Sequence, residues 1–395
     1  MQTEARAGVW RLRGALAMMV LSGALNYADR SNLSIGATNI QNDLHLSKYQ
    51  LGILLSAFFW TYALSQLLNA AGWIVDRWNV GWVLMGGVAL WSFATGACGL
   101  AHSLALLFAL RFLVGAGESI AYPSYGRIIV NCFDERHRGF SNAAIDAGTK
   151  LGPALGASLG GLLIPRYGWR IFFVVLGACG LLWAIAWMFS MPQSPRLSAG
   201  LKTKVDVGEI LRLPELWWTS LGLFGSNYFW YFLITWLPPY LEDERGFPKE
   251  KMAAFSTMSY LAIALSSVSS GWLSDRWIAR GGSPTRVRRT FAVGGLAFST
   301  ILLGVQMVSG ETAAMALLLI ASVSFGAYAS NVFAITQTLA GPAASGRWTS
   351  IQNGIGNLAG VAAPWFTGWV AQYTGSFFFA FLAATMAVIL SAMTY

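Results

Sequence analysis

Two charged clusters inside apolar segments hold the residue types best suited to chemistry. The stretch Asn26-Tyr27-Ala28-Asp29-Arg30-Ser31-Asn32-Leu33-Ser34 places an acid beside a base, and Arg111 precedes Glu118 in a second apolar run. A charge in hydrocarbon costs at least about 2.5–3.5 kcal/mol, so these groups must face a protein interior or a water-filled cavity. They predict a site for a charged solute and a proton. The alternative is a set of structural ion pairs that lock neighbouring helices together.

The composition is that of a membrane protein with many spans. Of 395 residues, 55% are hydrophobic and 11% are charged, whereas a soluble domain has about 25% charged residues. Long apolar runs recur from end to end, and many of the 18 tryptophans stand near their ends, as interfacial belts require. No cleavable signal peptide is expected. The runs predict twelve transmembrane helices, at residues 14–40, 50–75, 81–100, 103–131, 139–164, 169–191, 216–241, 251–276, 288–309, 312–338, 347–371 and 375–395.

The positive charges predict the orientation of these spans. Of the 26 Lys and Arg residues, 16 fall in the N-terminal segment and the loops on its side, 6 fall in the other loops and 4 lie within spans. Basic loops stay in the cytoplasm, so both termini are expected there, in the inner membrane of a bacterium. The net charge of +9 therefore reflects a lipid bilayer as partner and not a nucleic acid.

No resident cofactor or metal is predicted. The three cysteines, Cys98, Cys132 and Cys179, are an odd number in or beside spans, which argues against a disulfide framework and a metal site. The sequence has no phosphate-binding loop, so ATP is not expected to drive any transport. An enzyme would need a nucleophile and base or metal ligands at cavity depth, and the three histidines fall in predicted loops. A transport-like receptor remains an alternative.

The chain divides into two related halves. The longest polar segment, residues 192–215, separates six predicted spans in residues 1–191 from six in residues 216–395. Two sets of six spans that repeat at half-chain spacing predict an all-α membrane protein, with two six-helix bundles related by pseudo-two-fold symmetry around a central path. The halves also repeat a motif after their second spans, Gly72-Trp-Ile-Val-Asp76-Arg77 and Gly271-Trp-Leu-Ser-Asp275-Arg276.

This repeated loop resembles the hallmark of the major facilitator superfamily. Within that superfamily, three stretches resemble the anion:cation symporter family, which includes bacterial sugar-acid symporters and the vesicular glutamate and sialic acid carriers. The resemblance covers essentially the whole chain and implies two bundles that rock about a central site. The three stretches are Asn26 to Ser34, Arg111-Phe-Leu-Val-Gly-Ala-Gly-Glu118 with Tyr122-Pro123, and Asn227-Tyr-Phe-Trp-Tyr-Phe-Leu-Ile-Thr-Trp-Leu-Pro238.

The helical rise places the two arginines at one level. Arg30 lies ~24 Å along the first span and Arg111 lies ~12 Å in from the opposite end of the fourth, so both fall at similar depth. Two guanidinium groups there predict a pincer for a carboxylate, unless Arg111 is a tether to Glu118 or Asp29. Glu118 is expected deeper, near the midplane. The family resemblance implies that Asp29 and Glu118 are the proton-linked pair.

Uncharged and small residues complete the predicted site. Uncharged donors and acceptors in the first, seventh and eleventh spans suit a hydroxylated substrate: Tyr27, Asn227, Tyr228, Trp236 and Asn353. Asp76 with Arg77, and Asp275 with Arg276, are expected to be gate contacts at the cytoplasmic ends.

A stripe of glycines in the fifth span, Gly148, Gly152, Gly156 and Gly160 with Pro153, predicts close packing between the halves. It also resembles an antiporter motif of drug exporters. Asp146 and Lys150 are spaced to pair along one helix face. Lys150 is alternatively an extra contact for a second substrate carboxylate.

These features together predict a proton-coupled importer of a small organic anion that works as a monomer without a cofactor. A sugar acid such as an aldonate, aldarate or hexuronate is the expected substrate class. The alternatives are an importer of aromatic or dicarboxylic acids, or a proton-linked exporter or exchanger. An exporter of apolar or cationic compounds would have an apolar cavity and little need for two buried arginines.

Overall fold

The computed structural model describes residues 2–68, 70–133, 135–191, 207–329 and 331–395, and every regular element in these residues is a helix. In chain order the helices are α1 (Gln2–Ile35), α2 (Ala37–Asp43), α3 (Lys48–Leu67), α4 (Ala70–Arg77), α5 (Val80–Cys98), α6 (Leu104–Glu118), α7 (Ala121–Cys132), α8 (Glu135–Ser190), α9 (Val207–Leu211), α10 (Pro214–Asp243), α11 (Lys249–Ala279), α12 (Pro284–Ser299), the 3-10 helix η1 (Thr300–Leu303), α13 (Gly304–Met307), α14 (Glu311–Ala329), α15 (Val332–Asn357), α16 (Ala359–Thr374) and α17 (Phe378–Thr394).

Polar residues between the apolar runs start several of these helices. The Ser47 side chain accepts a hydrogen bond from the Gln50 amide at the start of α3, and the Gln50 side chain accepts one from the Ser47 amide. Asn79 and Ser103 cap α5 and α6 in the same way through their side-chain oxygens. Such caps satisfy backbone donors that a helix leaves free at its first turn. Within α8, Gly168 has a φ of 79°, and this left-handed residue separates the predicted fifth and sixth spans.

Several predicted spans, the first, fourth and eleventh among them, are interrupted in ways that hydropathy did not indicate. The first span continues as α1 only to Ile35, and α2 follows after Gly36. The fourth span is broken just after Glu118 into α6 and α7. The loop expected at residues 339–346 lies inside α15, and the eleventh span is divided between α15 and α16. Hydropathy reflects the cost of moving side chains out of water and does not report where a helix breaks. Small and polar residues can stay helical, or can break a helix, where neighbouring helices supply contacts to the backbone.

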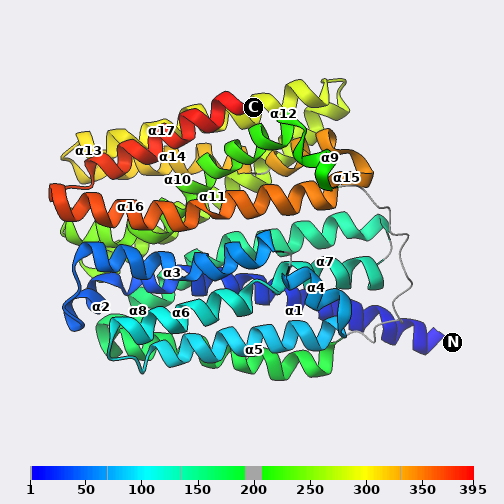
Figure 1. Cartoon of the computed structure of the whole chain (residues 1–395), viewed down its shortest axis with the longest axis horizontal. Helices are drawn as coiled ribbons and strands as arrows, with labels where there is room; N and C mark the ends of the chain where they lie inside the picture. The colour runs from blue at the N-terminus through cyan, green and yellow to red at the C-terminus, as the bar shows by residue number, and fades with distance from the viewer. Residues whose placement is uncertain (1, 69, 134, 192–206, 330) are drawn as a thin grey trace.

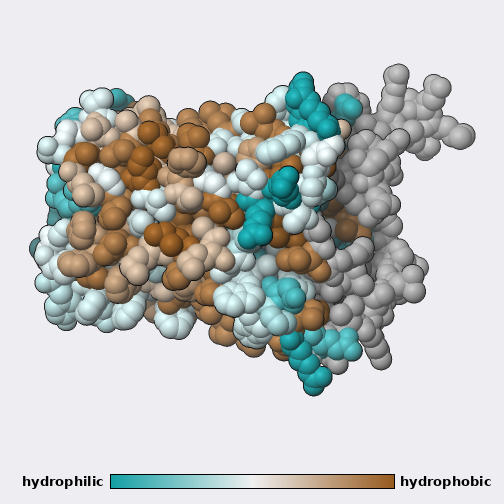
Figure 2. All heavy atoms as spheres, turned by 90° about the horizontal axis from the view of Figure 1, so that it is seen from above, coloured by the Kyte–Doolittle hydropathy of each residue, from teal (hydrophilic) through white to brown (hydrophobic). Residues whose placement is uncertain are grey.

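Six helical segments of the described chain are long and apolar enough to cross a membrane: Val80–Cys98, Leu104–Cys132, Ser141–Ser190, Lys249–Ala279, Pro284–Met307 and Glu311–Ala329. Helices α1 and α10, which carry many of the candidate ligands, are not among them. The space-filling view shows a broad apolar surface with polar side chains towards its ends (Figure 2). Exposed side chains such as Phe298, Val323 and Leu390 belong to the outer helices α12, α14 and α17, where lipid would solvate them.

The helices form two groups in space, called here the first half (residues 2–191) and the second half (residues 207–395). Figure 1 shows α1 to α8 on one side and α10 to α17 on the other. The halves repeat an internal contact. Ser22 of α1 shares a 2.7 Å hydrogen bond with Tyr125 of α7, and Ser226 of α10 shares one of the same length with Tyr328 of α14. The sequence separations are nearly equal, 103 and 102 residues, so the same helix pairing occurs twice.

The glycine stripe packs inside the first half, so the expectation that it lies between the halves is wrong. A Cβ atom on Gly152 would lie 2.6 Å from the Cβ atom of Tyr27, and one on Gly156 would lie 2.8 Å from the Ser31 hydroxyl. Both contacts are with α1, which approaches α8 so closely that its backbone occupies the space of a side chain. The stripe therefore fixes the helix that carries Arg30. Pro153 lies inside α8 beside it.

The two halves meet tightly at one end of the molecule. Helix α3 contacts α16, α8 contacts α11, and α1 contacts α10. At the start of α3, a Cβ atom on Gly52 would lie 2.7 Å from the carbonyl oxygen of Pro364. Lys249 of α11 donates a 3.0 Å hydrogen bond to the carbonyl of Ile35, at the break between α1 and α2, and pairs with Glu242 of α10. Small residues and polar contacts thus close this end.

We expect Gly52→Ala to lower the melting temperature of the purified protein in detergent. The added methyl group meets backbone of α16, which must shift, and such overpacking costs about 1–3 kcal/mol. Gly86→Ala on α5 is the matched control because a Cβ atom there meets nothing within 4 Å. Equal melting temperatures for both variants would show that α3 and α16 are not in tight contact.

Candidate functional site

The centre of the first half holds a buried ion pair. The Nε atom of Arg30, on α1, donates a 3.0 Å hydrogen bond to Oε2 of Glu118, the last residue of α6. The two side chains are only 2% and 0% exposed. Among the described residues, the Nη2 atom of Arg30 and the Oε1 atom of Glu118 have no hydrogen-bond partner. The pair therefore leaves one donor and one acceptor unsatisfied in a buried place, where such groups are costly.

Aromatic rings surround the Arg30 guanidinium group. Its Cζ atom lies 4.6 Å from the ring centre of Tyr27, 4.3 Å from that of Tyr62 and 5.0 Å from that of Phe58. These are cation–π distances, and they replace part of the hydration that burial removes. Phe58 and Tyr62 were not among the site residues predicted from the sequence. Their i,i+4 spacing on α3 was a usable signal, but aromatic residues are common in spans and nothing tied these two to Arg30.

Arg111 is held by the turn of α1 that contains Asp29. Its Nη1 atom donates to the main-chain oxygen of Asp29 and to the Oδ1 atom of Asn32, both at 3.2 Å. The Nδ2 atom of Asn32 donates in turn to the Asp29 carboxylate, also at 3.2 Å. The structure thus tethers Arg111 to Asp29 through backbone and through Asn32, and not through a direct ion pair of the two side chains.

Both arginines lie beside the same aromatic ring of α3. The Phe58 ring centre is 5.0 Å from the Cζ atom of Arg30 and 5.6 Å from that of Arg111. Each guanidinium group already has protein partners, however, so the two do not form an open pincer here. The Nη2 atom of Arg30 and the Nε atom of Arg111 have no hydrogen-bond partner among the described residues, so each group keeps one buried donor for a carboxylate.

The second half contributes uncharged groups from α10 and α15. Tyr231 packs against Phe59 of α3 with ring centres 4.4 Å apart and donates a hydrogen bond to Asn357. The main-chain oxygen of Asn353 accepts from Asn357 at 2.7 Å. Phe59 in turn contacts Phe58, with ring centres 4.9 Å apart, and the Phe58 ring lies against Arg30. Tyr231 therefore brings a hydroxyl group of the second half to the arginine site.

The other expected ligands of the second half are placed differently. Asn227 is half-buried against Gly356, and Tyr228 is buried. Trp236 is fully buried and donates from its indole nitrogen to the carbonyl of Pro364 at 3.1 Å. That bond ties α10 to α16, so in this structure the Trp236 indole nitrogen is used in helix packing.

The expected gate residues lie at the opposite end from the Gly52 contact. The Arg77 guanidinium group lies 5.5 Å from the Trp73 ring, and that of Arg276 lies 5.0 Å from the Trp272 ring, so the repeated motif also repeats its geometry. Asp275 is exposed. The side chain of Asp76 lies outside the described residues.

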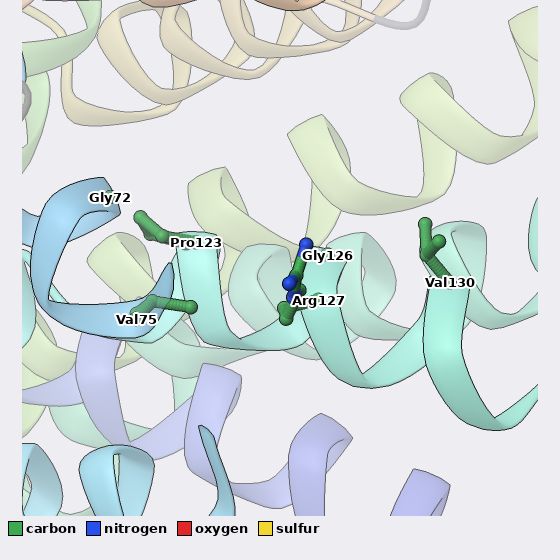
Figure 3. A pocket seen from close by; sticks show the side chains of 6 residues that line it. All are labelled: Gly72, Val75, Pro123, Gly126, Arg127 and Val130. Carbon is green, nitrogen blue, oxygen red and sulfur yellow. The ribbon is translucent and has the colours of Figure 1, made fainter. Parts of the chain in front are cut away.

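A shallow pocket of about 230 Å³ opens beside the first of these motifs (Figure 3). Gly72 and Val75 of α4 line one side, and one face of α7 lines the other, with Pro123, Gly126, Arg127 and Val130. The pocket begins five residues after Glu118, and it follows α7 away from the ion pair.

Comparison with known proteins identifies the family. A model of the Major Facilitator Superfamily matches residues 19–364. The chain belongs to this superfamily. It is 30% identical over 380 residues to a hexuronate transporter of Bacillus subtilis (strain 168), covering 93% of this chain and 89% of that protein. It is 28% identical over 387 residues to a D-galactonate transporter of Escherichia coli O6:H1 (strain CFT073), covering 91% and 89%.

The fold of this superfamily member matches a solved structure of the same kind. It superimposes with a TM-score of 0.83 on a bacterial homologue of the human lysosomal transporter Spinster, in an inward-facing and occupied conformation. The two chains are 21% identical, and the match covers 96% of this chain and 95% of the other. The protein is thus an integral, multi-pass, all-helical membrane transporter and not an enzyme, as the sequence predicted.

Breaking the ion pair should destabilise the protein more than removing it. We expect Glu118→Leu to lower the melting temperature strongly, because an unpaired buried guanidinium group costs about 3–5 kcal/mol. The double variant Arg30→Leu with Glu118→Leu should recover part of that loss. Melting of the purified parent, both single variants and the double variant measures the coupling. Losses that simply add would mean that the two side chains do not stabilise one another.

Proposed function

We propose that this superfamily member takes up a small organic anion of the sugar-acid class together with protons, by alternating access. The observation that carries the proposal is the buried Arg30–Glu118 pair, with a donor and an acceptor left unsatisfied among hydroxylated aromatic rings. A carboxylate fits the donor, a proton fits the acceptor, and the tyrosine and asparagine groups nearby suit substrate hydroxyls. Relatives named as hexuronate and D-galactonate transporters support the same substrate class.

The ion pair supplies a direct way to couple the two solutes. While Glu118 is ionised, it occupies Arg30. Protonation of Glu118 removes the negative charge and leaves the guanidinium group buried without a counter-ion, which is unfavourable. A substrate carboxylate then restores the balance. Asp29 is the second proton site in this proposal, because its carboxylate accepts from Asn32, which also binds Arg111.

The proposed architecture is twelve spans in two six-helix bundles, residues 1–191 and 216–395, joined by a linker at 192–215. The repeated Ser22–Tyr125 and Ser226–Tyr328 contacts support related halves. The tight contacts at the Gly52 end support a path that is closed on that side. The protein would work as a monomer in a bacterial inner membrane.

We propose a cytoplasmic location for both termini and the linker, on the basis of the 16-to-6 distribution of basic residues. A single cysteine at position 204 (Lys204→Cys), in a background that lacks the three native cysteines, should resist an impermeant thiol reagent in intact cells. It should react after the cells are opened. Labelling from outside intact cells would reverse the assignment.

An exporter of cationic compounds is less well supported. Two buried guanidinium groups repel a cation, and the rings of Tyr27, Phe58 and Tyr62 are already occupied by Arg30. Aromatic acids and dicarboxylic acids remain compatible with the same arginines, since each presents a carboxylate.

We expect Glu118→Gln to abolish uptake against a gradient but to spare exchange of substrate across the membrane. Glutamine keeps an oxygen that accepts from Arg30 but carries no titratable proton, so binding survives and coupling does not. Proteoliposomes loaded with sugar acid, with and without a pH gradient, measure the two activities separately. Accumulation equal to that of the parent would mean that Glu118 is a structural residue.

Binding of the anion should tighten as the pH falls from about 8 to about 5, because protonation of Asp29 and Glu118 frees positive charge. Arg30→Lys and Arg111→Lys keep the charge but lose the planar fork, and each should weaken binding at least about tenfold. Calorimetry on the purified parent and both variants across this range tests both statements. A cationic-drug exporter would show the reverse, and affinity indifferent to pH and to both substitutions would place the substrate elsewhere.

A further inference from the structure

We propose that Lys150 binds a second acidic group of the substrate, so that the preferred substrates are sugar acids with a carboxylate at each end. The inference rests on the proposed function and names the substrate class within it. Three observations carry it: the face of α8 on which Lys150 stands, the weakness of its ion pair with Asp146, and the packing of α8 against the helix that carries Arg30.

Lys150 stands on the face of α8 that is turned towards the second half. Further along that face, Ser158 shares a 3.0 Å hydrogen bond with Thr257 of α11, and the Ala154 carbonyl accepts from the same threonine at 3.3 Å. A Cβ atom on Gly161 would contact Ala253 of α11. The two halves are therefore in close contact along α8 from residue 154 to residue 161.

This contact ends at Lys150. The ring centre of Trp230, on α10, is 6.0 Å from the Lys150 amine, at the limit of a cation–π contact. One turn earlier, the Asp146 side chain is 58% exposed, whereas that of Lys150 is 21% exposed. The side chains on this face therefore become more exposed from residue 154 to residue 146, and Lys150 stands at the edge of the contact between the halves.

The amine is only loosely held. Its ion pair with Asp146 is 3.9 Å long, between residues one turn apart, and Asp146 is largely exposed. An exposed pair of this length stabilises a protein little, and its geometry leaves ammonium donors available to another oxygen. This contrasts with Lys249, whose side chain is 10% exposed and whose amine is bound by both Glu242 and a main-chain oxygen.

Close packing holds the helix of Lys150 against the helix of Arg30. Gly152, two residues further along α8 and on the opposite face from Lys150, lies directly against Tyr27 of α1. The Tyr27 ring in turn lies 4.6 Å from the Arg30 guanidinium group. Arg30 and Lys150 therefore stand on two helices in direct contact, with Arg30 buried and Lys150 partly exposed. In our proposal one acid bridges them, with its first carboxylate at Arg30 and its second at Lys150.

The test uses a matched pair of ligands, D-gluconate and D-glucarate, which differ only in whether the sixth carbon is an alcohol or a carboxylate. Calorimetry on the full-length purified protein gives the ratio of the two affinities. We expect the parent to prefer glucarate, and Lys150→Gln to reduce that preference at least about tenfold, since it removes a charge-assisted contact. Lys150→Arg should retain most of the preference.

Two further variants keep the test decisive. Asp146→Asn releases the amine from its weak partner, so it should increase the preference for glucarate, a gain that no folding defect produces. Lys251→Gln is the matched control, because Lys251 pairs with Glu311 outside this site. An affinity ratio unchanged by Lys150→Gln would overturn the role of Lys150 alone. A parent that binds neither acid would overturn the sugar-acid function and this inference with it.

Discussion

Burial of the Arg30 guanidinium group beside the Glu118 carboxylate is the interaction on which the first half depends. Removing two ions from water costs several kcal/mol for each, and their attraction repays this only with further favourable contacts. The rings of Tyr27, Phe58 and Tyr62 supply such contacts. Helix α1 can present Arg30 to them because glycines on α8 let the two backbones touch. Much of the packing of this half therefore serves to hold one charge.

The sequence predicted the chemistry of this centre but not its pairing. Charged residues in apolar segments are visible without a structure, and the helical rise alone placed Arg30 and Arg111 at one level. Which carboxylate meets which arginine depends on how helices are rotated. Arg30 and Glu118 are 88 residues apart, and no local pattern fixes that angle. The same reason explains why Phe58 and Tyr62 were missed and why Trp236 proved to tie α10 to α16.

Helix continuity was the other property that sequence patterns described poorly. The number and order of the apolar runs follow from hydropathy, but the break after Glu118 and the one at Gly36 do not, since both occur inside apolar runs. The glycine stripe on α8 was recognised as a close-packing surface, and only its partner was wrong. A small-residue stripe specifies that another helix comes near, whereas the identity of that helix is set by the whole bundle.

The repeat also shows where the halves differ. Ser22 and Ser226 occupy matching places, and Arg30 follows the first by eight residues as Ile234 follows the second. Likewise Glu118 precedes Tyr125 by seven residues, as Ala321 precedes Tyr328. Both counterparts, Ile234 and Ala321, are buried and apolar.

One scaffold is thus used twice, with the ion pair installed in only one copy. In the proposed alternating-access cycle, this asymmetry lets the second half move across a charged centre without desolvating charges of its own. The main electrostatic change in the proposed cycle is then the opening and closing of the ion pair, because the proton binds Glu118 and the anion binds Arg30.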